Sequence, residues 1–64
     1  MADYAPEVKK ALHAAGWRYD RAGKGDHEVW VNPATGMHVA VDGKIVSRHM
    51  ANGILKQAGL TKQF

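Results

Sequence analysis

Four histidines and one serine are the first candidates for proton transfer or nucleophilic attack in this chain. The histidines are His13, His27, His38 and His49. A zinc site needs three or four converging ligands, and the spacing of these histidines matches no short metal-binding motif. The absence of cysteine excludes a Cys-based zinc site, a thiol nucleophile and a disulfide framework. We therefore predict no metal site and no cofactor, and we interpret Ser47 as a helix N-cap.

The setting of His27 suits catalysis best. It follows a Gly-Lys-Gly-Asp turn at residues 23–26, which supplies exposed backbone and a cation, and a histidine exchanges protons near neutral pH. RNA carries its own nucleophile, the 2′-hydroxyl, so one histidine with cationic neighbours is enough to cleave it without a metal ion. Lys24, Lys44 and Arg48 are the cations that we expect to contact such a substrate. The alternative is that His27 only forms a hydrogen bond across the turn.

Five elements are expected to position these residues. Apolar residues at helical spacing predict two helices, and alternating or β-branched residues predict three strands between them. In chain order these are a helix over residues 6–15, strands over 17–22, 26–32 and 37–42, and a helix from Ser47 to about Ala58. We predict an α+β fold with the order α-β-β-β-α, in which two helices cover one face of a three-stranded antiparallel sheet.

Length, charge and hydropathy limit the class of protein. With 64 residues we expect a single domain over residues 1–64, because a chain this short cannot build two cores. No apolar run approaches the roughly 18 residues that span a bilayer, and residues 1–10 contain no signal-peptide core. We therefore expect a cytoplasmic protein with no membrane partner. The net charge of +3 is a mild bias toward polyanions such as nucleic acid.

Three segments give the chain its resemblance to a known family. They are Ala-Gly-Trp at residues 15–17, Gly-Lys-Gly-Asp-His-Glu-Val-Trp at 23–30 and Gly-Ile-Leu-Lys-Gln-Ala-Gly-Leu at 53–60. In this order and spacing, over about residues 6–60, the chain resembles the HicA family of small toxins, also called YcfA-like mRNA interferases. The resemblance implies a fold like that of a double-stranded-RNA-binding domain, which agrees with the predicted element order.

The resemblance also implies an activity, a catalytic residue and a partner. The activity is metal-independent cleavage of mRNA, which arrests translation, and the active histidine of the family's Gly-Ser-His motif falls on His27. The implied partner is a HicB-type antitoxin that covers the active surface, with DNA contacted only indirectly through the antitoxin. Asp26 stands where many members have serine. We expect Asp26 to tune His27 or a neighbouring cation, because a nearby carboxylate favours the protonated imidazole.

Two other hypotheses remain open beside the endoribonuclease. One is a non-catalytic RNA-binding module of the same fold, which recognises RNA mainly by shape. The other is a protein that works chiefly as half of a toxin–antitoxin assembly, and Trp30 motivates it. If Val29 and Val31 face the core, Trp30 faces outward and is a good anchor for the partner interface. The alternative is that a bulge near Gly25 shifts the register and buries Trp30.

Overall fold

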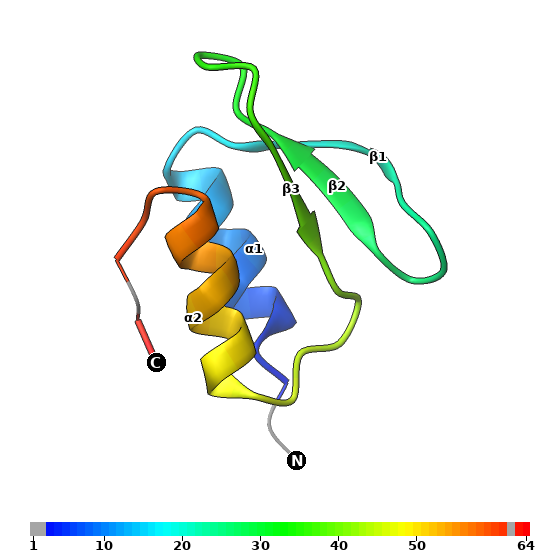
Figure 1. Cartoon of the computed structure of the whole chain (residues 1–64), viewed down its shortest axis with the longest axis vertical. Helices are drawn as coiled ribbons and strands as arrows, with labels where there is room; N and C mark the ends of the chain where they lie inside the picture. The colour runs from blue at the N-terminus through cyan, green and yellow to red at the C-terminus, as the bar shows by residue number, and fades with distance from the viewer. Residues whose placement is uncertain (1–2, 62) are drawn as a thin grey trace.

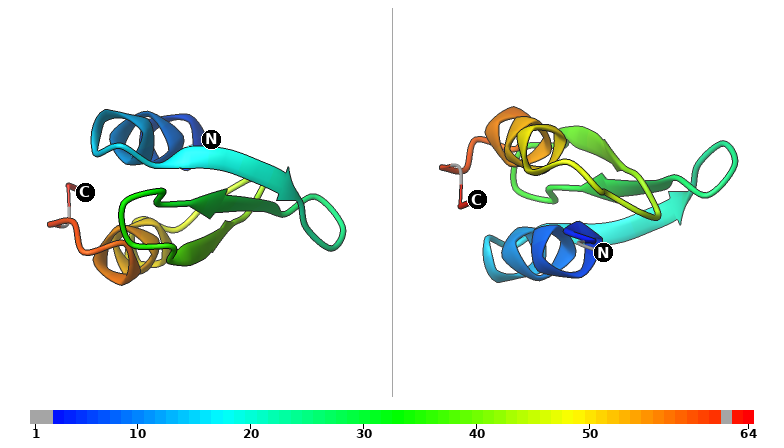
Figure 2. Two further views of the ribbon diagram at one scale, coloured as in Figure 1. Left: turned by 90° about the horizontal axis from the view of Figure 1, so that it is seen from above. Right: turned by 90° about the horizontal axis from the view of Figure 1, so that it is seen from below.

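Two helices lie side by side on one face of a three-stranded antiparallel sheet (Figures 1 and 2). The computed structural model describes residues 3–61 and 63–64, so residues 1, 2 and 62 of the expected domain lie outside the described residues. The elements are α1 (Ala5–Ala14), β1 (Arg18–Ala22), β2 (Glu28–Val31), β3 (His38–Val41) and α2 (Arg48–Gln57). The strand order is β1-β2-β3. The predicted α+β fold and its α-β-β-β-α order are confirmed.

Both helices end in the same way, and α2 begins as predicted. Gly16 and Gly59 have φ angles of +95° and +78°, which glycine adopts without steric cost. The residues after them fold back, since the N–H groups of Trp17 and Leu60 each donate to a carbonyl five residues earlier at 2.9 Å. At the start of α2 the hydroxyl of Ser47 accepts from the main-chain N–H of Met50 at 3.4 Å. The N-cap role of Ser47 is therefore confirmed.

The start of α1 is tied to the loop before α2. The carboxylate of Asp3 accepts from the N–H groups of Ala5 and Ile45, each at 3.0 Å, and Tyr4 N donates to Ile45 O at 2.7 Å. These hydrogen bonds from Ile45 and Ala5 hold the pKa of Asp3 below its usual value, and the positive charge of Lys44 adds to the effect. This clamp places the Ile45 side chain fully inside the core.

The core fills the space between the sheet and the helices. Its members come from both helices, the inner face of β2 and β3, and two loops: Ala5, Val8, Leu12, Trp17, Trp30, Val39, Val41, Ile45, Ala51, Ile54 and Leu55. Each helix has ten residues. Within the described residues, neither is long and apolar enough to cross a membrane.

Trp30 faces the core, so the expectation of an outward-facing Trp30 is wrong. Its exposed fraction is 8 %, whereas Val29 and Val31 are half-buried on the other face of β2. Trp30 lies opposite Val39 of β3, and its indole N–H donates to Glu28 Oε1 at 3.0 Å. The largest apolar side chain of β2 takes the covered face because it removes the most apolar area from water. The reason for placing Trp30 at a partner interface is thereby removed.

The sheet contains an irregularity, but it does not lie near Gly25. Arg18 to Tyr19 and Arg21 to Ala22 pair in register with β2, and the register shifts between Tyr19 and Arg21. The extra residue is therefore in the edge strand β1, at Asp20. An edge bulge of this kind increases the local twist and leaves the pairing of β2 with β3 undisturbed.

Candidate functional site

His27 lies at the surface, directly before β2. The turn that precedes it is closed by two main-chain hydrogen bonds, from Gly23 N to His27 O at 2.8 Å and from His27 N to Lys24 O at 3.2 Å. The His27 side chain is 46 % exposed. The ring is therefore anchored through its backbone and accessible to a large substrate.

Both nitrogens of the His27 ring have a partner. Nδ1 lies 3.0 Å from the carbonyl oxygen of Lys24, and Nε2 lies 2.9 Å from Oδ1 of Asp42. A carbonyl and a carboxylate only accept hydrogen bonds, so a ring that serves both carries hydrogen on both nitrogens. A third acceptor, Asp26 Oδ1, is 3.6 Å from Nδ1, beyond ordinary hydrogen-bond distance. The ring therefore lies between a main-chain carbonyl at Nδ1 and the carboxylate of Asp42 at Nε2.

Asp42 reaches His27 because of the register between β2 and β3. Glu28 and Val41 are cross-strand partners, so the residues one step beyond, His27 and Asp42, meet at the same end of the sheet. The sequence reasoning missed Asp42. Residues 32–36 read Asn-Pro-Ala-Thr-Gly, a sequence typical of a turn. Pairing residue 32 with residue 37 across this turn, and counting back along the two strands, would have placed His27 opposite Asp42.

A close approach of two loops holds this pair together. The turn before β2 and the loop after β3 emerge at the same end of the sheet (Figure 1). A Cβ atom added to Gly43 would lie only 2.8 Å from the main-chain oxygen of Asp26 and 3.0 Å from its Oδ2. Glycine is therefore required for this contact. Gly43 follows Asp42 and Asp26 precedes His27, so the packing of the two main chains sets the distance between the two side chains.

The start of β2 is also tied to α1. Lys9 Nζ of α1 lies 3.1 Å from Oε2 of Glu28, and the other carboxylate oxygen accepts from the Trp30 indole. The hydrogen bond from Trp30, with that from Lys9 and its charge, lowers the pKa of Glu28 although partial burial opposes the shift. The residue that follows His27 is thus fixed to both the core and a helix.

The three predicted RNA-binding cations are all exposed, but they differ in their relation to His27. Lys24 lies in the turn, is exposed, and contacts the ring through its carbonyl oxygen. Lys44 is exposed in the loop after Asp42, and Arg48 is the exposed first residue of α2. In the described part of the chain, the hydrogen bonds and ion pairs of the His27 ring involve Lys24, Asp26 and Asp42. Lys24 is therefore the one of the three predicted cations whose residue contacts the ring within the described part of the chain.

A second exposed histidine offers a comparison. His38 of β3 is 47 % exposed, and its Nε2 lies 3.5 Å from Oδ2 of Asp20. That same Asp20 oxygen also pairs with Arg21. Across residues 3–61 and 63–64, no three or more His, Asp or Glu side chains are grouped in a way that could hold a metal ion.

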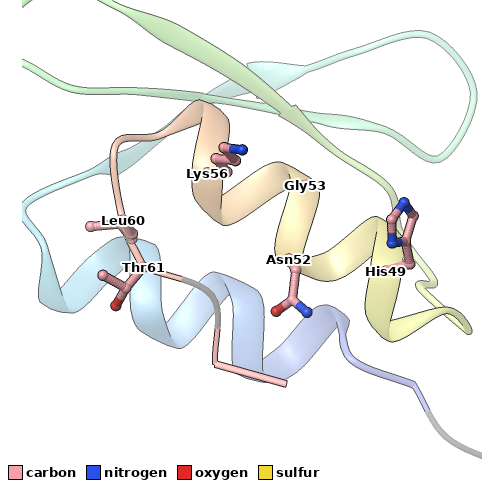
Figure 3. Close-up of a pocket in the computed structure, with 6 residues that line it drawn as sticks. All are labelled: His49, Asn52, Gly53, Lys56, Leu60 and Thr61. Carbon is pink, nitrogen blue, oxygen red and sulfur yellow. The ribbon is translucent and has the colours of Figure 1, made fainter.

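An open hollow lies beside α2, away from the His27 turn (Figure 3). It is lined by His49, Asn52, Gly53, Lys56, Leu60 and Thr61. The amide of Asn52 is occupied by the C-terminal residues: its Oδ1 accepts from the N–H groups of Gln63 and Phe64, and its Nδ2 donates to the main-chain oxygen of Phe64 at 2.9 Å. Phe64 in turn packs on Tyr4, with ring centroids 4.9 Å apart. Asn52 therefore anchors residues 63–64, and its amide is already engaged in these hydrogen bonds.

Comparison with known proteins identifies one family. A family model described as the HicA toxin of bacterial toxin–antitoxin systems matches residues 5–60. The match covers all five elements and includes His27 and Asp42. No significant match was found among curated proteins or solved structures. The resemblance seen in the three sequence segments is confirmed by the family model.

Proposed function

The chain belongs to the HicA family of bacterial toxins, and on this basis we propose that it is a metal-independent endoribonuclease that cleaves mRNA in the cytoplasm and arrests translation. HicA toxins pair with HicB antitoxins. We propose that such an antitoxin covers the His27 surface, and that DNA is contacted only through the antitoxin. The observation that carries the catalytic proposal is the exposed His27 ring, held in place by the turn and by Asp42.

The proposed reaction uses the nucleophile that RNA itself supplies. The 2′-oxygen attacks the adjacent phosphorus as the 2′-hydroxyl loses its proton, and the bond from phosphorus to the 5′-oxygen breaks as that oxygen gains a proton. The products are a 2′,3′-cyclic phosphate and a free 5′-hydroxyl. His27 acts as a general acid or base in these transfers. A ring with hydrogen on both nitrogens is the form that donates a proton to the leaving oxygen, and both neighbours of the His27 ring are groups that accept from such a ring.

The cations around His27 are proposed to bind the RNA backbone. Lys24 flanks the phosphate that reacts, and Lys44 and Arg48 contact neighbouring phosphates. Contacts of this type add affinity that falls with salt concentration, and they carry little sequence information. We therefore expect substitution of Lys44 or Arg48 to weaken binding similarly for different RNA sequences.

A cleavage assay with a modified substrate tests the reaction. The purified chain is incubated with end-labelled RNA in EDTA, and with the same oligonucleotide carrying 2′-deoxyribose throughout. We expect fragments that end in a 2′,3′-cyclic phosphate from the RNA and none from the deoxy oligonucleotide. Cleavage of both would contradict attack by the 2′-hydroxyl. Binding of RNA without any fragments would instead favour a non-catalytic RNA-binding module, which the α-β-β-β-α order also suits.

A further inference from the structure

We propose that Asp42 is the positioning residue for His27: it holds Nε2 in place and leaves Nδ1 as the nitrogen that meets the RNA. The inference rests on the proposed function and adds to it a second residue and a direction for the ring. It is carried by the 2.9 Å contact between Asp42 Oδ1 and His27 Nε2, and by the packing of Gly43 on Asp26 that holds the two loops together.

The two partners of the ring differ in strength. Asp42 offers a carboxylate, and a hydrogen bond with an ionised donor or acceptor is roughly twice as strong as one between neutral groups. Lys24 offers a neutral carbonyl, which also accepts from the main-chain N–H of His27. The weaker contact is the one that an incoming phosphate displaces. Nδ1 therefore exchanges its partner for the substrate, while Nε2 stays on Asp42.

Asp42 differs from the other carboxylates near exposed histidines. Asp26 is 74 % exposed and lies 3.6 Å from Nδ1, so it is neither well placed nor well shielded. Asp20 is shared between His38 and Arg21. Asp42 is 30 % exposed, and among the described ion pairs its only partner is His27. A carboxylate that is dedicated to one ring and held by the backbone fixes the ring before substrate arrives, which lowers the entropic cost of reaching the reactive geometry.

Substitution of Asp42, with Asp26 as the matched control, separates positioning from simple charge. Single-turnover cleavage at saturating RNA and the Kd for RNA are measured for wild type, Asp42→Ala, Asp42→Asn and Asp26→Asn. We expect Asp42→Ala to cleave about 10- to 100-fold more slowly, because part of the roughly 10²- to 10⁴-fold contribution of a general acid or base is lost. Its Kd should be unchanged or lower, since a negative charge has been removed near a polyanion.

The conservative variant and the control give the sharpest contrast. Asp42→Asn keeps an oxygen that accepts from Nε2–H, so it should recover part of the rate that Asp42→Ala loses. Asp26→Asn should slow cleavage less than Asp42→Ala does, because the Asp26 carboxylate lies 3.6 Å from Nδ1, beyond hydrogen-bond distance, and acts on the ring only through its charge. Far-UV circular dichroism establishes that each variant is folded.

The ring itself gives a readout that does not depend on cleavage. Nitrogen-15 NMR of the free protein reports the two ring nitrogens of His27 separately, and the Nε2 signal should move in Asp42→Ala more than in Asp26→Asn. A wild-type rate in Asp42→Ala, or an equal loss in Asp26→Asn, overturns the role of Asp42 and leaves the proposed function standing if His27→Ala is inactive. Absence of cleavage by the wild-type protein overturns both.

Discussion

Replacing Gly43 with alanine should weaken the fold and disturb the site at the same time. The added Cβ would lie 2.8 Å from the main-chain oxygen of Asp26, whereas ordinary contacts begin at 3.4 Å, so the two main chains must separate by about 0.6 Å. Overpacking of this kind costs about 1–3 kcal/mol. The φ angle of Gly43 lies outside the left-handed region, so alanine can adopt the same backbone conformation. Alanine also restricts the unfolded chain, and this effect stabilises the folded state by about 0.4–1 kcal/mol.

The net loss of about 1–2 kcal/mol is a measurable part of the stability of a domain this size. At about 4–8 °C per kcal/mol for small domains, it corresponds to a fall in Tm of about 4–16 °C. Gly53→Ala is the matched control, because the same added atom would meet nothing within 4 Å. In the middle of α2, alanine should instead stabilise by roughly 0.5–1 kcal/mol.

Thermal unfolding followed by circular dichroism compares the two variants, and the cleavage assay follows the site. We expect Gly43→Ala to lower both Tm and the cleavage rate, and Gly53→Ala to raise Tm with the rate unchanged. A Gly43→Ala protein that is as stable and active as Gly53→Ala would refute the close approach between Gly43 and Asp26. A lower Tm with an undiminished rate would show that the approach does not hold the His27–Asp42 pair.

Three further predictions concern the stability that the core and the contacts near the two ends of the domain provide. Trp30→Ala should cost about 3–5 kcal/mol, which would leave most of the protein unfolded near 37 °C by circular dichroism; a fully folded variant would contradict the burial of Trp30. The pKa values of Asp3 and Glu28 are lowered in the folded state. Both carboxylates therefore stabilise the fold at a pH above the pKa values they have in the unfolded chain. This stabilisation is lost as the pH falls through the pKa values they have in the folded protein. Tm should therefore drop below about pH 4, and less steeply in Asp3→Asn, whereas parallel profiles would exclude the Asp3 clamp. Asn52→Ala removes the three hydrogen bonds to the C-terminal residues and should cost about 1–2 kcal/mol in urea unfolding; an effect no larger than that of exposed Gln57→Ala would argue against anchoring.

The order of elements could be predicted because helical and strand periodicities are local signals. The face of β2 could not be predicted in the same way, since Val29, Trp30 and Val31 place apolar side chains on both faces. Packing against β3 and the hydrogen bond from Trp30 to Glu28 decide which face of β2 is turned to the core. The sequence alternatives had included a buried Trp30, but with a bulge near Gly25 rather than in β1.

Ile45 and Asp42 were missed in the sequence analysis because their contacts come from residues far away along the chain. Ile45 lies in a loop without periodicity, and its burial depends on main-chain and carboxylate contacts with Tyr4 and Asp3, about 40 residues away. Asp42 meets His27 only through the register of the β2–β3 pair. His27 itself was found from its turn and from the family resemblance, because a histidine beside glycines and a lysine is a local pattern.

The most direct test compares two exposed histidines that differ in their surroundings. His27 and His38 are exposed to 46 % and 47 %, and each lies near an aspartate, so alanine substitution removes a similar side chain from a similar surface. The rate of RNA cleavage in EDTA is measured for His27→Ala, His38→Ala and wild type, after circular dichroism has shown equal folding. We predict that His27→Ala yields no fragments while His38→Ala cleaves at close to the wild-type rate. Cleavage by a folded His27→Ala protein would remove His27 from the reaction.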